Sequence, residues 1–496
     1  MNVESAETRE TVLPGNPGRP GGSRRAFPRA ETVGSLLRGD AVVRAARRSS
    51  PADNALLGDA VRDAIRLQEE LGLDVITDGE VRRVSWAQTP RFVDAFAVGG
   101  GQPALNWRGA TEGRFGATAT APVGSGPGST SSGGYPSVIR RVATAPRTGD
   151  MAAEYAFLAR YAQSRTKFTM PAPSYHRRYW SQAASPAAGY GSPEEFLTEI
   201  RDYLRSVAHT LIDLGCDYIQ LDAPNYGSLC DPDTVAAMRA AGRDPDAELE
   251  YDAGLDSSLF DGLAGVTSAL HVCRGNGPAG AWHSVGGYGA ISARLFPRLA
   301  VDRLLLEYDS DRAGGFEPLA DTRTGTAVVL GLLTTKSPQL EYDADVLARI
   351  EEATRFKPLA ELALSTQCGF ASVPVANPVT PEAQRAKLEL VVRLARQVWP
   401  ALEAALARAE ADDEARRRRP GHPERGRADT RAAVALPAAG RARRRAVTLI
   451  RPPGAVPSRR PPAAAGKPPG RRDALPCAHG GPPTWPGEPP CGASRR

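Results

Sequence analysis

The feature that most constrains the fold is an alternation of short apolar runs with longer helical patterns, which begins near residue 28. Such alternation is typical of βα units around a parallel sheet. Eight of these units over residues 28–400 predict a (β/α)8 TIM barrel. The expected strands are 31–35, 74–80, 167–171, 217–222, 267–273, 303–308, 327–333 and 361–367.

Start and stop signals bound three of the expected helices. We expect helices over 56–71, 193–214 and 381–398. A glycine directly follows each of the first two, and a Ser-Pro or Thr-Pro pair opens the second and third. Proline is favoured in the first helical turn and glycine just past the last one.

Segments of a different composition flank this region and interrupt it. Residues 1–27 and 401–496 are rich in Pro, Gly and Arg and poor in large apolar side chains, so both are expected to be disordered. A long insertion after the second strand, 84–150, is rich in Gly, Ser and Thr around 116–135 and is expected to be flexible over residues 100–150. The sequence therefore predicts one barrel domain, 28–400, between two disordered segments.

The charge distribution limits the kinds of partner. The formal net charge of +6 comes from residues 401–496, whereas residues 1–400 carry an acidic excess. Nucleic-acid binding by the barrel is therefore not expected, and a basic tail is usually a solvated extension. The sequence also shows no apolar run long enough for a membrane span and no signal peptide near its start. Together with six irregularly spaced cysteines, this predicts a cytoplasmic protein with reduced thiols.

His271 and Cys273 are two residues apart at the end of the fifth expected strand. Side chains at positions i and i+2 of a strand point to the same side, so both could bind one metal ion. Cys368 follows the eighth strand and could complete the site. Two thiolates and an imidazole suit Zn²⁺ and leave one position open for chemistry. The alternative is that these cysteines are small hydrophobic residues of the core.

More polar residues lie at the carboxyl ends of the expected strands, where TIM barrels carry their active sites. They are Gly34, Ser35, Glu80, Asp222 and Glu307. Glu307 could be a fourth zinc ligand that a substrate thiol displaces, or it could pair with Arg303 or Arg312. A zinc-bound thiolate is a nucleophile suited to attack on an activated alkyl carbon.

Glu80 and Asp222 are candidates for a different task at the same end of the barrel. Two carboxylates there could bind a substrate ammonium group through charge-assisted hydrogen bonds. Salt bridges with neighbours such as Arg82 or Arg83 are the alternative.

Several separated phrases occur in a recognisable order along the chain. They are Thr32-Val33-Gly34-Ser35-Leu36, Asp78-Gly79-Glu80, Ile219-Gln220-Leu221-Asp222, His271-Val272-Cys273-Arg274-Gly275-Asn276, Gly286-Gly287-Tyr288, Glu307-Tyr308-Asp309, Gly315-Phe316-Glu317-Pro318-Leu319 and Gln367-Cys368-Gly369-Phe370-Ala371-Ser372. With these phrases the chain resembles the cobalamin-independent methionine synthase family, especially its short single-barrel branch, which is related to epoxyalkane:coenzyme M transferases. The resemblance covers residues 28–400, with 100–150 poorly matched.

The resemblance implies a reaction and a role for each matching residue. The reaction is methyl transfer to the thiol of homocysteine, of the 5-methyltetrahydropteroyltri-L-glutamate–homocysteine S-methyltransferase type, which gives methionine. The methyl donor would be a methyl-folate or methylcobalamin. The catalytic zinc site would consist of His271, Cys273, Glu307 and Cys368. The amino-acid part of homocysteine would bind to Gly34, Ser35, Glu80 and Asp222.

Two positions depart from the family pattern. Lys336 stands where the full-length enzymes have a histidine, and Ala223 replaces a glutamate. These changes leave open zinc-dependent alkyl transfer to another small thiol, with an epoxide or methylcobalamin as donor. A non-catalytic, zinc-stabilised barrel with a basic nucleic-acid-binding tail is an alternative of another class.

Four aromatic or histidine side chains are weaker candidates. His176 follows the third strand and could face the barrel mouth or contact solvent as a loop residue. His283 could line the pocket, and Trp107 could stack on a flat donor or pack within the insertion. His209 lies in an expected helix, where a structural role is the simpler interpretation.

Overall fold

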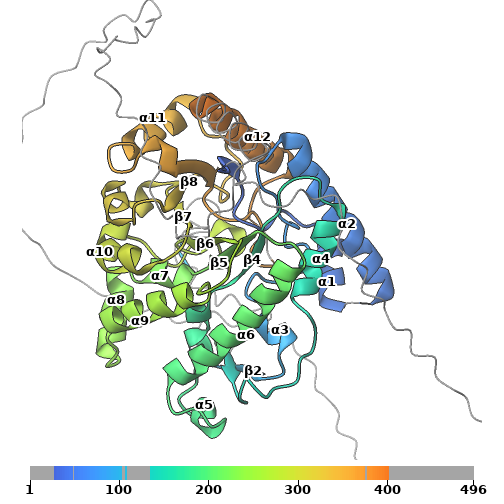
Figure 1. The fold of residues 1–496 in the computed structure, drawn as a ribbon, viewed down its shortest axis with the longest axis vertical. Helices are drawn as coiled ribbons and strands as arrows, with labels where there is room; N and C mark the ends of the chain where they lie inside the picture. The colour runs from blue at the N-terminus through green and yellow to red at the C-terminus, as the bar shows by residue number, and fades with distance from the viewer. Residues whose placement is uncertain (1–26, 49, 103–106, 109–134, 375–376, 401–496) are drawn as a thin grey trace, which may run out of the picture. The chain divides into compact units, whose positions relative to one another are not determined.

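The computed structural model describes residues 27–48, 50–102, 107–108, 135–374 and 377–400. Its main sheet has seven parallel strands in the order β1-β9-β8-β7-β6-β5-β4. Helices lie around this sheet (Figure 1). The strands are β1 (Ala30–Glu31), β4 (Phe168–Pro171), β5 (Tyr218–Asp222), β6 (Thr267–Val272), β7 (Arg303–Glu307), β8 (Ala327–Leu333) and β9 (Leu362–Thr366).

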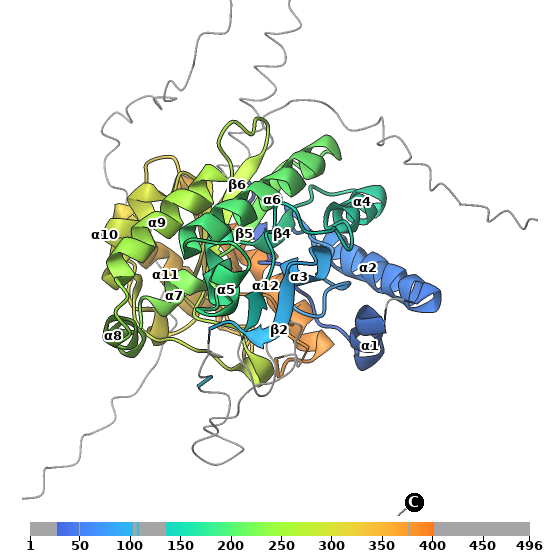
Figure 2. The same ribbon diagram turned by 90° about the horizontal axis from the view of Figure 1, so that it is seen from below.

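Helices lie between the successive strands in the chain, as the parallel order requires, and the last helix follows the last strand; Figure 2 shows them from below. They are α1 (Asp40–Arg48), α2 (Pro51–Leu71), α3 (Thr89–Phe92), α4 (Ala152–Tyr161), α5 (Ala184–Ala187), α6 (Pro193–Asp213), α7 (Pro224–Ser228), α8 (Pro232–Ala240), α9 (Pro245–Ser258), α10 (Ser292–Leu295), α11 (Asp343–Ala353) and α12 (Pro381–Val398). No helix in the described ranges is long and apolar enough to cross a membrane.

Capping explains where the predicted helices begin. Helices α6 and α12 match their predicted ranges to within one residue, and the Ser192 and Thr380 hydroxyls accept hydrogen bonds from the first turns. Helix α2 begins five residues before the predicted start. Ser50 and Asp53 form a capping box there, followed by Pro51 in the first turn.

The first two predicted strands are shorter than expected. Strand β1 has two residues, and the 74–80 segment is not assigned as a strand. Instead, Val75 and Ile76 form isolated parallel bridges with Glu31 and Thr166, at the two edges of the seven-stranded sheet. The extended backbone ends at Gly79 and Glu80, whose φ angles of 68° and 53° are left-handed.

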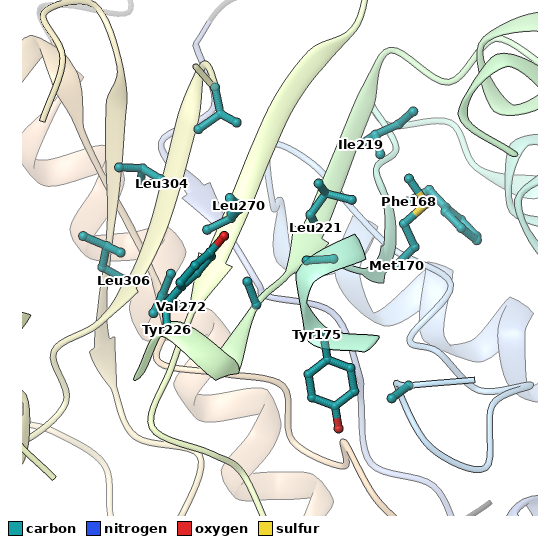
Figure 3. Packing of buried hydrophobic residues seen from close by; sticks show 14 of the residues in the cluster. Phe168, Met170, Tyr175, Ile219, Leu221, Tyr226, Leu270, Val272, Leu304 and Leu306 are labelled. Carbon is teal, nitrogen blue, oxygen red and sulfur yellow. The ribbon is translucent and has the colours of Figure 1, made fainter. Parts of the chain in front are cut away.

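Side chains along each strand point alternately to the two faces of the sheet, so the apolar residues form two separate clusters. Residues such as Ile219, Leu221, Leu270 and Val272 belong to the larger cluster, which includes the residues facing the helices (Figure 3). The opposite side of the sheet carries a smaller cluster, to which strands β5 to β9 each contribute one residue. It comprises Val33, Val75, Tyr218, Ala269, Leu305, Val329 and Ala363. The sheet is therefore buried on both faces, as parallel sheets are.

A charged cluster lies on this second face of the sheet. Lys167 Nζ is 2.7 Å from Glu31 Oε2, and Arg303 is 2.6 Å from Glu31 Oε1. Burial alone would raise the pKa of Glu31, but the two cations lower it to about 2. The Tyr218 hydroxyl also donates to Glu31, at 3.0 Å.

Two antiparallel strands, β2 (Phe96–Gly100) and β3 (Pro136–Val138), form a separate small sheet. Strand β3 falls within the 100–150 segment that was predicted to be flexible, so this part of the segment has regular structure. Residues 103–106 and 109–134 of that segment lie outside the described residues. The predicted disordered segments, 1–27 and 401–496, also lie outside them apart from Phe27.

Candidate metal centre

The fold brings together the three residues that were predicted to bind a metal from sequence spacing. One ligand atom from each of His271, Cys273 and Cys368 lies within 4.8 Å of the others. His271 is in β6, Cys273 follows that strand, and Cys368 follows β9. All three side chains are buried, with 2%, 4% and 6% of their surface exposed. The group has the composition of a three-ligand zinc site.

The imidazole of His271 has the orientation that metal binding requires. Its Nδ1 atom lies 3.0 Å from the Leu305 carbonyl oxygen, to which it can only donate. This contact places the proton on Nδ1 and leaves Nε2 with a free lone pair. Nε2 is buried and has no hydrogen-bond partner among the described residues. A buried acceptor without a partner is costly, and a metal ion at this position would remove that cost.

The two cysteine thiols interact, and their pKa values shift in opposite directions. A hydrogen bond from Cys273 lowers the pKa of Cys368 well below its usual value, and His271 adds to this effect. The same contact, together with burial, raises the pKa of Cys273. Burial opposes protonation of His271, but the neighbouring Cys368 thiolate raises its pKa. Cys368 is thus stabilised as a thiolate by its neighbours, and the thiolate is the form of cysteine that binds a metal ion.

Glu307 ends β7 close to this group, but it is engaged in other contacts. Its Oε2 accepts a hydrogen bond from the backbone N–H of Arg274 at 2.8 Å, and its Oε1 lies 3.0 Å from Arg312. Burial would raise the pKa of this carboxyl, but Lys336, Arg274 and Arg312 lower it. Glu307 is therefore an ionised carboxylate paired with Arg312, one of the partners considered from sequence, and it is not among the three grouped ligands.

Lys336 reaches the loop that follows β6. Its Nζ donates to the Gly275 carbonyl oxygen at 2.9 Å and to Asn276 Oδ1 at 3.1 Å. The amide nitrogen of Asn276 in turn donates to the Gly369 carbonyl oxygen and to the Ser372 hydroxyl. The ammonium group is thus fixed between the segments that carry Cys273 and Cys368.

Glu80 is held in a strained conformation at the same end of the sheet. Its φ of 53° is rare for a residue with a side chain, and such strain is concentrated at functional sites. Glu80 Oε1 accepts a 2.7 Å hydrogen bond from Thr169 and lies 3.6 Å from Arg83. Gly34 leaves the space for this carboxylate, because a Cβ on Gly34 would overlap Glu80 Oε1.

Asp222 ends β5 and is paired in register with His271. Burial raises its pKa to about 7; the charge of His271 and a hydrogen bond from Gln220 oppose the rise, and Glu80 adds to it. The two carboxylates are neighbours, because Thr169, which donates to Glu80, is the register partner of Gln220, which donates to Asp222. Two buried carboxylates beside each other favour the binding of a cation between them.

Ser35 lies beside the segment that carries Cys368. Its backbone carbonyl oxygen accepts from the Phe370 N–H at 2.8 Å, and its hydroxyl accepts from the Ala371 N–H at 3.3 Å. Gly369 packs against it so closely that a Cβ there would overlap the Ser35 hydroxyl. Each of the eight site residues predicted from sequence therefore lies at one end of the main sheet.

The weaker candidates have other environments. His176 is fully buried, with Nε2 at 2.8 Å from the Thr89 hydroxyl, so the solvent-facing interpretation is wrong; burial lowers its pKa to about 4. His283 is buried against Trp107, at 5.5 Å between ring centroids, and burial lowers its pKa to about 3. His209 is exposed on α6.

Sequence reasoning missed three polar residues that support the site: Lys167, Thr169 and Gln220. Lys167 Nζ donates to Gln220 Oε1 at 2.8 Å, and Gln220 donates to Asp222 at 2.7 Å. A signal was present, because polar residues alternate with apolar ones in both strands at a period of two. This period places them on the same side as Asp222.

Comparisons with known proteins give relatives along most of this chain. The uncharacterized Bacillus subtilis proteins YxjH and YxjG are 33% and 32% identical to it, over 76% and 75% of this chain and 96% and 94% of their own length. No family model matches.

Solved structures show the same fold. One is a Listeria monocytogenes protein provisionally named a vitamin-B12 independent methionine synthase, with 25% identity and a TM-score of 0.53. It is matched over 76% of this chain and 99% of its own. A B12-independent methionine synthase from Shewanella sp. W3-18-1, in complex with selenomethionine, has 20% identity and a TM-score of 0.53, over 76% and 100%.

Proposed function

We propose that this chain, which belongs to the family of the Bacillus subtilis proteins YxjH and YxjG, is a zinc-dependent methyltransferase that converts homocysteine to methionine. The observation that carries the proposal is the buried group of His271, Cys273 and Cys368, in which one imidazole nitrogen lacks a partner. The provisional name of the Listeria relative supports the same reaction class.

The three grouped side chains would hold the zinc ion, with Glu307 as the proposed fourth ligand. Glu307 is close enough to Cys273 to raise the pKa of that thiol, although its carboxylate is now paired with Arg312. Bound zinc would supply one property, the stabilisation of a substrate thiol as a thiolate near neutral pH. Glu307 would hold the ion in place of its contacts with Arg312 and the Arg274 N–H, which remain available to it when the substrate thiol is bound.

The amino-acid part of the substrate would bind beside the thiol. Glu80 and Asp222 would accept hydrogen bonds from its ammonium group, since they are neighbouring carboxylates. Ser35 and Gly34 would border its carboxylate, because they lie next to the Cys368 segment and next to Glu80, respectively.

The transfer itself is a displacement at the methyl carbon. The substrate sulfur forms the new S–C bond, the bond between the methyl group and the donor breaks, and its electron pair remains on the donor. Lys336 stands beside this centre and would stabilise the developing negative charge on the leaving group. Methyl-folate and methylcobalamin both fit this scheme as donors.

Lys336 also favours a second candidate function, alkyl transfer to another small thiol with an epoxide or methylcobalamin as donor. Opening an epoxide leaves a negative charge on oxygen, which an ammonium group stabilises. The remaining alternative, a non-catalytic barrel with a nucleic-acid-binding tail, depends on residues 401–496, outside the described residues.

We propose that residues 28–400 form a complete (β/α)8 catalytic barrel with the 74–77 segment as its second strand. The parallel bridges of Val75 and Ile76 support this arrangement. The site would then lie at the carboxyl end of the barrel strands, as in other enzymes of this fold.

A substrate screen on the full chain tests the proposed function. Purified protein would be analysed for zinc and then incubated with homocysteine and each donor in turn: a methyl-folate, methylcobalamin and a short epoxide. We expect about one zinc ion per chain and formation of methionine with one of the two methyl donors. Epoxide consumption without methionine formation would favour the second candidate, and a metal-free chain with none of these activities would contradict both.

A further inference from the structure

Gln220 connects the barrel interior to Asp222. Both side chains lie on the same side of β5, two residues apart, and Gln220 is fully buried. Gln220 Nε2 donates to Asp222 Oδ1 at 2.7 Å. Asp222 Oδ2 has no hydrogen-bond partner among the described residues, so that oxygen is the one left for a ligand.

Lys167 determines which way the Gln220 amide points. A lysine ammonium group can only donate hydrogen bonds, so the atom of Gln220 that lies 2.8 Å from Lys167 Nζ must be the carbonyl oxygen. The NH₂ group of the amide is therefore directed at Asp222. If the amide were flipped, its NH₂ group would face the Lys167 ammonium group, which is also a donor. Its carbonyl oxygen would then face the Asp222 carboxylate, which is also an acceptor.

Lys167 is itself held in place by a buried carboxylate. Its Nζ lies 2.7 Å from Glu31, which also binds Arg303 and the Tyr218 hydroxyl. All of these side chains are buried, so the positions of the network are strongly constrained. Because Gln220 bonds to both Lys167 and Asp222, this network also limits the position of the Asp222 carboxylate.

Glu80 is supported in the same way from the neighbouring strand. Thr169 of β4 donates to Glu80 Oε1, and Thr169 is the register partner of Gln220. Each carboxylate thus has one oxygen held by a buried donor. The other oxygens, Asp222 Oδ2 and Glu80 Oε2, have no hydrogen-bond partner among the described residues.

We propose that Gln220 is a positioning residue which, locked by Lys167, directs Asp222 at the ammonium group of the substrate and so sets a preference for amino thiols. The inference rests on the proposed function, because it takes homocysteine as the substrate. In this arrangement Gln220 acts on the substrate through Asp222, so its effect should depend on Asp222 and on the presence of the ammonium group.

Substrate binding provides the test, since it needs no methyl donor. Calorimetry on the zinc-loaded full chain would compare homocysteine with 4-mercaptobutanoate, the same thiol without its amino group. In Gln220→Glu, Lys167 keeps an acceptor while Asp222 loses its donor and faces a like charge. We expect the affinity for homocysteine to fall about tenfold to a hundredfold, the range for a lost hydrogen bond to a charged group. Affinity for 4-mercaptobutanoate should change less than about threefold, well below that range.

A double-substitution cycle separates positioning from a general structural effect. In Asp222→Asn, wild-type Gln220 and Gln220→Glu should bind homocysteine equally. Gln220→Met, which cannot repel Asp222, serves where the glutamate variant fails to fold. Gln384→Glu is the matched control, because Gln384 is a buried glutamine that bonds to the Leu37 backbone N–H, and it should retain the wild-type preference.

The outcomes distinguish the two proposals. Equal losses for both thiols in Gln220→Glu, or a loss that persists in Asp222→Asn, would overturn the positioning role while leaving the proposed function intact. Equal affinity of the wild-type protein for the two thiols would instead contradict homocysteine as the substrate.

Discussion

At the scale of single residues, the contact between Gly34 and Glu80 shows how closely the site is packed. Gly34→Ala would place a methyl group on the Glu80 carboxylate and within 3.3 Å of the Thr169 methyl group. We expect the affinity for homocysteine to fall about fivefold or more, because overpacking of this kind costs about 1–3 kcal/mol and about 1.4 kcal/mol is a factor of ten. Titration calorimetry would measure the loss. The exposed Gly39, which has open space around it, gives the matched control Gly39→Ala.

The cysteines permit a second experiment at this scale. Cys368→Ser and Cys273→Ser should each lower zinc content to less than about a tenth and abolish methyl transfer, since serine is a poor zinc ligand. Cys216→Ser is the control, because Cys216 is equally buried but bonds to the Tyr218 carbonyl oxygen. Metal analysis of the three purified variants provides the measurement. Full zinc content in Cys368→Ser would exclude this residue as a ligand.

At the scale of structural elements, Asp256 of α9 joins two other segments. Its carboxylate accepts hydrogen bonds from the Ser174 backbone N–H and hydroxyl, and from the Tyr226 hydroxyl of α7. Burial raises its pKa to about 7 from the usual 3.8. The folded state therefore binds the proton more tightly than the unfolded state, and the stability from this group is lost as pH rises from about 4 to 7.

Because this contribution to stability is lost as pH rises, the effect of Asp256→Asn on stability should depend on pH. The variant should be less stable than wild type by about 1–3 kcal/mol at pH 5, because two hydrogen bonds to one carboxylate oxygen are lost. The difference should shrink as pH rises to 8, by at most about 1.4 kcal/mol per pH unit below pH 7. Urea unfolding at both pH values measures it. A difference that widens with pH would show that Asp256 is ionised at a lower pH in the folded state.

The loop after β8 gives another prediction at this scale. Lys336→Met should keep zinc, because Lys336 contacts Gly275 and Asn276 and none of the three grouped ligands. The rate of methyl transfer should fall by about 10²-fold or more, the usual effect of removing a group that stabilises developing charge. Lys336→Arg, which keeps the charge, should recover part of the rate. An unchanged rate in Lys336→Met would remove Lys336 from the reaction.

The elements also show which parts of the structure could be predicted from sequence. Helices α6 and α12 carry local start signals, so their bounds follow from a few adjacent residues. Strand β1 could not be bounded in this way, since Ala30 pairs with Leu364, more than 300 residues away. The grouping of His271, Cys273 and Cys368 was predictable because each lies at or just after the end of a strand. The contacts of Glu307 with Arg312 and of Lys167 with Gln220 depend on side-chain conformation, which strand order does not determine.

At the scale of the whole molecule, the grouped ligands come from strands that are not neighbours in the sheet. His271 is in β6, Cys273 follows β6 and Cys368 follows β9, with β7 and β8 between these two strands in the sheet. A metal ion held by all three would cross-link distant parts of the chain. Because the unfolded chain cannot present these ligands together, binding of the ion stabilises the folded state.

Metal removal should therefore lower the stability of the whole chain as well as its activity. Binding at a free metal concentration of about a thousand times Kd adds about 4 kcal/mol to the unfolding free energy, so a strong chelator should lower Tm by several degrees. Adding zinc back should restore it. The Cys368→Ser variant is the control, since its Tm should not respond to the chelator once the site is lost. If wild type and this variant respond equally, the stabilising metal binds elsewhere, and the proposal that His271, Cys273 and Cys368 form the centre fails.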